Sequence, residues 1–330
     1  MSVEIIAEVA QGYAGDPTLA RLLARSAVLA GADAVKFQLV YADELATPNY
    51  PYYARFQKLQ MPQDAWHCVV QEVRAGKRRL YLDVFGERSL GEAKAMGADG
   101  VKIHSTDFFN DDLVREALAC MSRVFVSLGG ISADELEEFL HRHHLRPSDS
   151  LCLLYGFQGF PTPIDSNHLQ RLGTLRVRFP GYPFGFMDHT DGSDEETMTV
   201  SLVALAYGVQ CIEKHITLDR TLQLEDYISA LDGEHFRHFV QRVRQLESAL
   251  GTESLELSAP EWEYRRKAVK TIVAKQHLKQ GDVVTLNQLC FKRAAEKSSE
   301  TSIYRLDEAV GRTLVADVAP NQSLTREMVR

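Results

Sequence analysis

Long apolar runs are absent from this 330-residue sequence, although 45% of its residues are hydrophobic. A membrane-spanning helix needs about 20 consecutive apolar residues, and the apolar stretches here are much shorter. The beginning of the sequence also lacks the basic region, apolar stretch and cleavage site of a secretory signal peptide. We therefore expect a soluble, globular, cytoplasmic protein with no membrane partner.

Cysteine and positive charge are also scarce. The five cysteines are odd in number, widely spaced and form no Cys-x-x-Cys pair, which argues against a disulfide framework and against a zinc knuckle. The formal net charge is -8, whereas a nucleic-acid-binding protein is expected to carry a basic stripe. We expect reduced cysteines, most of which pack in the core, and no nucleic-acid partner. A local basic pocket for an anionic substrate is compatible with this overall charge.

What the chain does contain is a regular alternation of short apolar segments with helical patterns. The segments predicted as strands are 3–9, 34–39, 80–84, 100–104, 124–128, 151–157, 184–188 and 210–216. Between them, apolar residues recur at the three- and four-residue spacing of amphipathic helices. An eightfold alternation with parallel crossovers favours an α/β fold closed into a (β/α)8 barrel. Strand counting alone leaves a doubly wound sheet as the alternative.

The alternation stops near Leu255. A polar segment that is compatible with a helix follows, and after it come short strand-like and turn-like segments in roughly 60 residues. So few residues make a small module docked on a partner more plausible than a self-sufficient domain. We predict a barrel domain at 1–255, a linker at 256–268 and a small β-rich domain at 269–330.

Polar or charged residues stand at the ends of many predicted strands. They include Glu8, Lys36, Lys102, Ser127, His189 and His215. The carboxyl ends of barrel strands line the reaction site of such folds, and residues two apart on a strand face the same way. Because a buried ammonium group is costly without a partner, each lysine needs an anion beside it. A substrate phosphate or carboxylate would serve, and so would Glu213 in a purely structural ion pair.

The two strand-end histidines predict a possible divalent-metal site. Imidazole together with carboxylate or water suits metals such as Mn²⁺, Fe²⁺ and Zn²⁺, although a structural histidine would explain either residue alone. The Gly129-Gly130 turn after the fifth predicted strand precedes the capping-box pattern that starts at Ser132. Such a turn exposes backbone amides to a bound anion, although simple turn geometry would also explain it.

Several motifs, taken in order along the chain, resemble those of the sialic acid synthase family. They are Ile6-Ala7-Glu8-Val9-Ala10, Gly31-Ala32-Asp33-Ala34-Val35-Lys36-Phe37-Gln38, Val101-Lys102-Ile103-His104-Ser105, Phe160-Pro161-Thr162-Pro163, Asp188-His189-Thr190 and Ile212-Glu213-Lys214-His215. The segments Leu278-Lys279-Gln280-Gly281-Asp282 and Phe291-Lys292-Arg293 resemble the small antifreeze-like (SAF) domain of the same synthases. The resemblance spans nearly the whole chain.

This resemblance implies a TIM barrel that condenses phosphoenolpyruvate with an open-chain amino sugar, which yields a 2-keto-3-deoxy acid and phosphate. It implies a divalent metal, Mn²⁺ or Mg²⁺, held by His189 and His215. It also implies a homodimer in which each SAF domain covers the partner's active site.

The resemblance assigns roles to further residues. Those expected to hold phosphoenolpyruvate are Lys36, Lys102, Ser105 and Ser127, with Glu213 handling protons. Those expected to face the acceptor are Glu8, Gln38, Asp107, Asp226 and Arg293, the last from the partner subunit. Gln158, in the sixth-strand motif, is expected to bind substrate.

Some positions depart from the family pattern. Gly12-Tyr13-Ala14 replaces Asn-His-Asn, Met187 replaces a serine, Gln158 replaces an asparagine, Leu224-Glu225 replaces Gly-Pro, and Ala294-Ala295 replaces Pro-Gly. The lysines and histidines are retained, which suggests phosphoenolpyruvate chemistry with a non-standard acceptor. The alternatives are a metal-dependent pyruvate aldolase or lyase, and a non-catalytic ligand-binding barrel. A Schiff-base aldolase is less favoured, because two cations in one pocket suit a phosphate better than a carbonyl.

Overall fold

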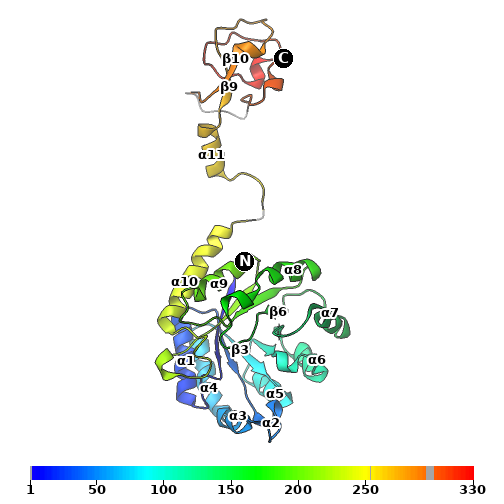
Figure 1. The fold of residues 1–330 in the computed structure, drawn as a ribbon, viewed down its shortest axis with the longest axis vertical. Coiled ribbons are helices and arrows are strands. Elements are labelled where there is room, and N and C mark those ends of the chain that lie inside the picture. The colour runs from blue at the N-terminus through cyan, green and yellow to red at the C-terminus, as the bar shows by residue number, and fades with distance from the viewer. Residues whose placement is uncertain (1, 253, 295–300) are drawn as a thin grey trace. The chain divides into compact units, whose positions relative to one another are not determined.

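A computed structural model of the chain describes residues 2–252, 254–294 and 301–330 (Figure 1). Ala295, the last residue of one altered motif, lies outside the described residues. The chain forms two compact units, Met1–Gly251 and Thr252–Arg330. Each unit has its own apolar core.

The first unit is a closed barrel of parallel strands, as predicted. The strands, hydrogen-bonded in sequence order with β8 closing onto β1, are β1 Glu4–Ala10, β2 Ala34–Gln38, β3 Arg79–Val84, β4 Gly100–Ile103, β5 Val124–Ser127, β6 Leu151–Tyr155, β7 Phe184–Asp188 and β8 Cys211–His215. Closure excludes the doubly wound sheet, whose edge strands remain open.

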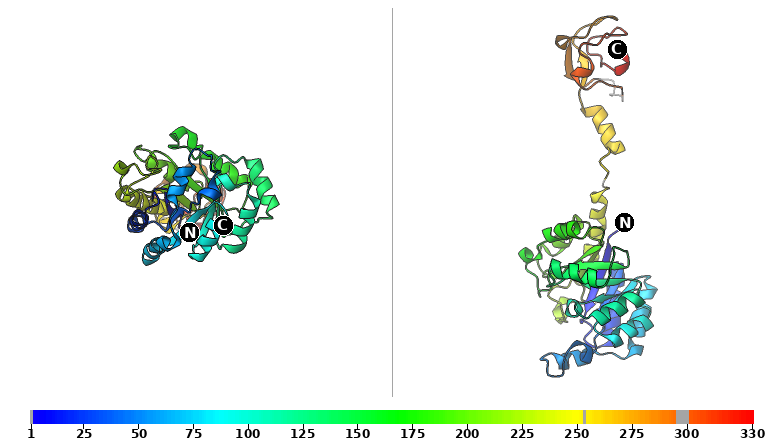
Figure 2. Two further views of the ribbon diagram at one scale, coloured as in Figure 1. Left: turned by 90° about the horizontal axis from the view of Figure 1, so that it is seen from below. Right: turned by 90° about the vertical axis from the view of Figure 1, so that its right-hand side faces the viewer.

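Helices surround the strands (Figure 2). They are α1 Pro17–Ala30, α4 Gln63–Ala75, α5 Glu87–Ala95, α6 Asp111–Cys120, α7 Ala133–Arg142, α8 Gln170–Arg178, α9 Thr197–Leu205 and α10 Gly233–Leu250, with the short α2 Ala42–Leu45 and α3 Tyr53–Leu59 after β2. Among the described residues, no helix is long and apolar enough to cross a membrane.

The first helix shows how the sequence sets an element's limits. The Asp16 carboxylate accepts hydrogen bonds from the Thr18 and Leu19 amides and so caps the amino end of α1. Gly31 ends the helix with φ 92°, in the left-handed region that glycine adopts without steric cost. The buried face between these caps packs toward the barrel, and the chain then turns directly into β2.

The barrel interior is filled by a layer of side chains below the carboxyl ends of the strands. Its members are Ile6, Ala34, Tyr81, Phe125, Cys152, Leu154, Met187 and Cys211. The interior is therefore a packed core, and ligands are left with the carboxyl-terminal mouth. The five cysteines are free thiols, as predicted, but the expectation that most pack in the core is wrong: only Cys152 and Cys211 are buried, in this layer, with their Sγ atoms 3.6 Å apart, and Cys68 is exposed.

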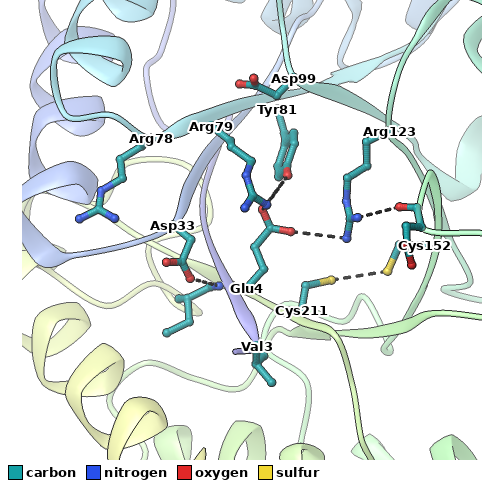
Figure 3. Close-up of polar contacts among 12 residues, drawn as sticks. Val3, Glu4, Asp33, Arg78, Arg79, Tyr81, Asp99, Arg123, Cys152 and Cys211 are labelled. Atoms are coloured by element: carbon teal, nitrogen blue, oxygen red, sulfur yellow. Dashed lines mark hydrogen bonds and ion pairs between the residues drawn. The ribbon is translucent and has the colours of Figure 1, made fainter. Parts of the chain in front are cut away.

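The amino-terminal end of the barrel carries an ionic cluster centred on Glu4 (Figure 3). Glu4 Oε1 accepts from the Tyr81 hydroxyl at 2.6 Å and pairs with Arg79, and Glu4 Oε2 lies 3.5 Å from Arg123 Nη2. The cluster joins β1 to β3 and to the start of β5. Residues at this end of a β/α barrel serve stability rather than chemistry.

The second unit combines one helix with short strands. Helix α11, Ala259–Ala268, begins with a capping box between Ser258 and Glu261, and strands β9 Thr271–Ala274 and β10 Leu289–Lys292 pair antiparallel. Its core contains Ile272, Leu278, Val284, Leu289, Ile303, Leu314, Val318 and Leu324. Helix α11 itself buries no residue, and Trp262 stays 46% exposed.

Candidate active site

A cavity of about 150 Å³ opens at the carboxyl ends of the barrel strands. It is lined by Glu8, Gln38, Lys102, His104, Gln158, Phe160, His189, Glu213, His215 and Asp226. Most of the predicted site residues therefore come together in one place. A larger groove of about 680 Å³ lies between α7 and α8, but its lining residues include no carboxylate and no lysine.

Two lysines and three carboxylates form a buried ionic cluster beneath this cavity. Lys36 Nζ lies 2.6 Å from Asp83 Oδ1 and 3.5 Å from Glu213 Oε2, and it also pairs with Glu8. Lys102 Nζ lies 2.8 Å from Glu213 Oε1 and 3.7 Å from Asp83 Oδ2. The carboxylates that the lysines require are thus supplied by the protein itself.

Burial and charge act against each other in this cluster. Burial alone would raise the pKa of Glu213, but the charges of Lys102 and Lys36 lower it to about 2. Glu213 is therefore ionised at neutral pH. Burial alone would lower the pKa of Lys102, but Asp83 and Glu213 raise it above its usual range. Burial lowers the pKa of Lys36, and the same carboxylates oppose that shift.

The two strand-end histidines face each other across the cavity wall. The ring centroids of His189 and His215 are 5.0 Å apart, and both rings pack edge-on against Phe160. Burial lowers the pKa of His189 to about 4, and burial together with His189 holds the pKa of His215 well below its ordinary value. Both imidazoles are therefore neutral at pH 7, the form that can bind a metal.

This pair fits part of a metal coordination sphere. His189 Nδ1 is a buried nitrogen with no hydrogen-bond partner among the residues that the structure describes, and the ionised Glu213 nearby favours a cation. Among the described residues, no group of three or more His, Cys, Asp and Glu side chains is arranged to hold a metal. Two imidazoles are fewer than the three protein ligands of a typical catalytic zinc site, so water or substrate would have to supply the remaining ligands of a metal held here.

The residues expected to hold phosphoenolpyruvate lie on β2 and at the β4 and β5 ends. Ser105 Oγ is 2.8 Å from Gln158 Oε1, and the buried Ser127 hydroxyl lies 3.8 Å from Met187 Sδ. Lys102 lines the cavity, whereas Lys36 is completely buried behind it. Lys36 therefore does not line the cavity, but it pairs with Glu8 and Glu213, which do.

The residues expected to face the acceptor are divided by the structure. Glu8 and Gln38 line the cavity, with Glu8 Oε1 accepting from the Ala10 amide at 2.6 Å. Asp226 also lines it, and burial raises the pKa of its carboxyl to about 6. Asp107 lies instead in the 3-10 turn Ser105–Asp107, where Asn110 and Thr106 donate to its carboxylate, and it does not line the cavity.

Arg293 belongs to the second unit, where its Nε donates to the Ala268 carbonyl at 3.0 Å. The contact fixes Arg293 to the end of α11 within that unit.

Sequence reasoning missed Asp83 and gave His104 no role. Asp83 is the one charged residue in Leu80-Tyr81-Leu82-Asp83-Val84, so the argument applied to the two lysines would have found it as well. His104 stands two residues after Lys102, and it lines the cavity as Lys102 does. Burial, with Lys102 adding to it, lowers the pKa of His104 to about 4.

Comparison with known proteins agrees with this geometry. The NeuB family model matches residues 23–254, and the SAF domain model matches residues 269–330. An N,N'-diacetyllegionaminic acid synthase of Legionella pneumophila is 25% identical, with 100% of this chain and 95% of that protein covered. The human N-acetylneuraminate-9-phosphate synthase is 25% identical, with 98% of this chain and 92% of that protein covered.

A solved structure extends the likeness to three dimensions. The crystal structure of the N-acetylneuraminic acid (sialic acid) synthetase of Leptospira borgpetersenii, in complex with citrate, is 27% identical and superposes with a TM-score of 0.74. The match covers 81% of this chain and 93% of that chain. The chain therefore belongs to the NeuB family, carries a SAF domain at its carboxyl end, and is an enzyme related to the sialic acid synthases.

Proposed function

We propose that this enzyme condenses phosphoenolpyruvate with an open-chain amino sugar to give a 2-keto-3-deoxy acid of the nonulosonic type and phosphate. The observation that carries the proposal is the convergence of Lys102, His189 and His215 on one cavity of a NeuB-family barrel. The cation suits an anionic donor, and the two neutral imidazoles suit a metal.

The donor is placed by the β4 and β5 ends. Lys102 meets the donor as a fixed cation at the cavity wall, and the hydroxyls of Ser105 and Ser127 contribute hydrogen bonds. Lys36 acts behind them, since it orients Glu8 and Glu213 from a fully buried position. A rigid arrangement of this kind stabilises charge that develops in the transition state without reorganisation during the reaction.

The reaction forms one carbon–carbon bond and exchanges one carbon–oxygen bond at C2 of phosphoenolpyruvate. The enol C3 attacks the sugar aldehyde carbon, whose oxygen takes up a proton, and water adds to C2. As the bond between C2 and the phosphate oxygen breaks, the added water gives up both of its protons: one offsets the proton on the former aldehyde oxygen, the other leaves with the phosphate, and C2 becomes a ketone. Asp226 suits the proton transfer because its pKa of about 6 makes both of its forms available near neutral pH. Glu213, with a pKa of about 2, serves as a permanent anion instead.

A divalent metal, Mn²⁺ or Mg²⁺, held by His189 and His215 would supply Lewis-acid polarisation of the aldehyde oxygen. Phe160 packs against both rings and limits their rotation. The surrounding burial keeps both imidazoles unprotonated and ready to bind.

The functional unit that we propose is a homodimer in which Arg293 of one subunit completes the site of the other. The apolar side chains exposed around α11, including Trp262 at 46% and Leu255 at 101%, support a packing surface for this segment outside its own unit. Mixing two inactive variants, Lys102→Met and Arg293→Ala, tests it. Subunit exchange should restore up to about a quarter of the activity, because half of the dimers are mixed and each has one intact site. Absence of recovery after verified exchange contradicts the shared site.

The reaction itself is tested by phosphate release from phosphoenolpyruvate with Mn²⁺ across N-acetylmannosamine, diacetamido hexoses, hexoses and pentoses, with mass analysis of products. Release that depends on one acceptor supports the proposal and identifies the acceptor. Condensation with pyruvate and no phosphate release would identify an aldolase. Firm phosphoenolpyruvate binding without turnover for any acceptor would identify a ligand-binding barrel.

A further inference from the structure

Gln158 occupies the space directly above the Gly129-Gly130 turn. A β-carbon at Gly129 would lie 2.7 Å from Gln158 Oε1 and 2.9 Å from its Cδ. The side chain thus lies against the backbone of the turn that connects β5 to α7, and it lines the cavity at the same time. Glycine at position 129 is what permits this contact.

The carboxamide of Gln158 is held from two sides. Its Oε1 accepts from Ser105 Oγ at 2.8 Å, and its Nε2 lies 3.2 Å from His104 Nε2. His104 Nδ1 accepts from the Thr106 amide, so Nε2 carries the proton of the neutral imidazole. A hydrogen bond to His104 therefore needs the carboxamide oxygen to face the imidazole and the nitrogen to face Ser105. With the oxygen toward Ser105 the carboxamide is held by Ser105 alone, and with the oxygen toward the imidazole it is held by both residues.

Several donors around Gln158 have weak acceptors or none. Among the described residues, the Ser127 hydroxyl donates only to the thioether of Met187, at 3.8 Å, and sulfur is a poor acceptor. Within the described residues, the amides of Gly129 and Gly130 donate to no protein group. Lys102 stands on the same wall of the cavity. The cation and the two hydroxyls lie beside Gln158, and the amide of Gly129 lies beneath its carboxamide, whereas Gly130 lines the groove between α7 and α8. These are groups that can bind an anion once the carboxamide leaves.

We propose that Gln158 is an internal occupant of this anion site, which a donor phosphate must displace, so that Gln158 lowers the affinity for phosphorylated ligands. This inference rests on the proposed function, since it concerns the phosphate of the same donor. When Gln158 swings toward the cavity mouth, the Ser105 hydroxyl and the Gly129 backbone become available to phosphate oxygens. His104 opposes that movement by holding the amide.

The experiment measures binding of phosphoenolpyruvate, inorganic phosphate and pyruvate to the full-length protein by titration calorimetry with Mn²⁺ present. Gln158→Ala and the shorter Gln158→Asn are compared with the wild type and with Gln170→Ala, an exposed glutamine at the start of α8. Thermal unfolding verifies that each variant is folded. Neither variant can make the hydrogen bond through which the Gln158 carboxamide competes with phosphate. Both Gln158 variants should therefore bind phosphoenolpyruvate and phosphate about five- to tenfold more tightly than the wild type. Pyruvate binding and the Gln170→Ala variant should not change.

Two other results separate the inference from the proposed function. If the wild type binds phosphoenolpyruvate and the Gln158 variants bind it equally or more weakly, Gln158 is a ligand or a bystander, and the inference fails while the function stands. If the wild type and all variants bind neither phosphoenolpyruvate nor phosphate, the donor assignment fails, and the inference fails with it. Equal tightening of pyruvate binding would also overturn the inference, because pyruvate has no phosphate to compete with the amide.

Discussion

Asp83 Oδ1 accepts a hydrogen bond of 2.6 Å from Lys36 Nζ, and both side chains are completely buried. The second oxygen, Asp83 Oδ2, points toward Lys102 at 3.7 Å. One carboxylate on β3 thus touches the lysines of both neighbouring strands. It sets their spacing below the cavity, although it does not line the cavity itself.

Replacing Asp83 should therefore destabilise the barrel. Asp83→Asn keeps the shape but leaves Lys36 with fewer compensating charges, and breaking a buried pair costs about 3 kcal/mol of unfolding free energy. Urea denaturation followed by far-ultraviolet circular dichroism measures it. Glu138→Gln, which breaks the exposed pair with Arg142, should cost about 0.5 kcal/mol or less. Equal effects of the two variants would contradict the structural role given to Asp83.

Removal of either strand-end histidine should weaken metal binding. His189→Ala and His215→Ala are expected to lower Mn²⁺ affinity by about 100-fold each, since one of two protein ligands is lost. Electron paramagnetic resonance titration reports free Mn²⁺ directly, without an activity assay. His238→Ala, an exposed residue of α10, is the control. Unchanged Mn²⁺ affinity in both strand-end variants would place the metal elsewhere.

Asp226 should make stability depend on pH in a defined direction. Its pKa is about 6 in the folded protein and 3.8 ordinarily, so the folded state binds the proton more tightly. Stability is unaffected by this group below about pH 4, falls as the pH rises through the window between the two values, and carries the full cost above about pH 6.

The variant Asp226→Asn removes that cost. Asparagine tolerates the left-handed backbone at this position, where φ is 62°. We expect the variant to be more stable than the wild type by about 1–2 kcal/mol at pH 8, after allowance for partial exposure, and no more stable at pH 4. Chemical denaturation at the two pH values measures the difference, and exposed Asp165→Asn is the control. A gain of the same size at both pH values would contradict the linkage.

The ionic cluster at the opposite end of the barrel should affect stability alone. Glu4→Gln weakens the ion pairs with Arg79 and Arg123, and it replaces the carboxylate that accepts the hydrogen bond of the Tyr81 hydroxyl by a neutral amide (Figure 3). A loss of about 1–3 kcal/mol in unfolding free energy is expected, because polar partners are left partly buried and unpaired. Calorimetric phosphoenolpyruvate affinity should stay unchanged. A large change in affinity at normal stability would mean that the two ends of the barrel are coupled.

Local patterns in the sequence were sufficient for much of the fold and part of the site. The eight strands follow from hydrophobic periodicity, whereas the structure divides the two units between Gly251 and Thr252, a few residues before the predicted boundary. The strand period of two puts Glu213 and His215 on one face, and both do line the cavity. His189 could be placed at a strand end, because a polar residue after an apolar run marks where a strand leaves the core.

Which charges meet was decided by the tertiary structure. Lys102 on β4 and Glu213 on β8 are 111 residues apart in sequence, and they pair because the sheet closes into a barrel that brings opposite strands within reach of long side chains. The same closure buries Lys36 behind its carboxylates and folds Gln158 onto Gly129. The sequence by itself determined the strands and the side chains that face inward, since both depend on local periodicity. Only three-dimensional packing decided the partner of each charge, because Coulomb interactions depend on distances that no local pattern contains.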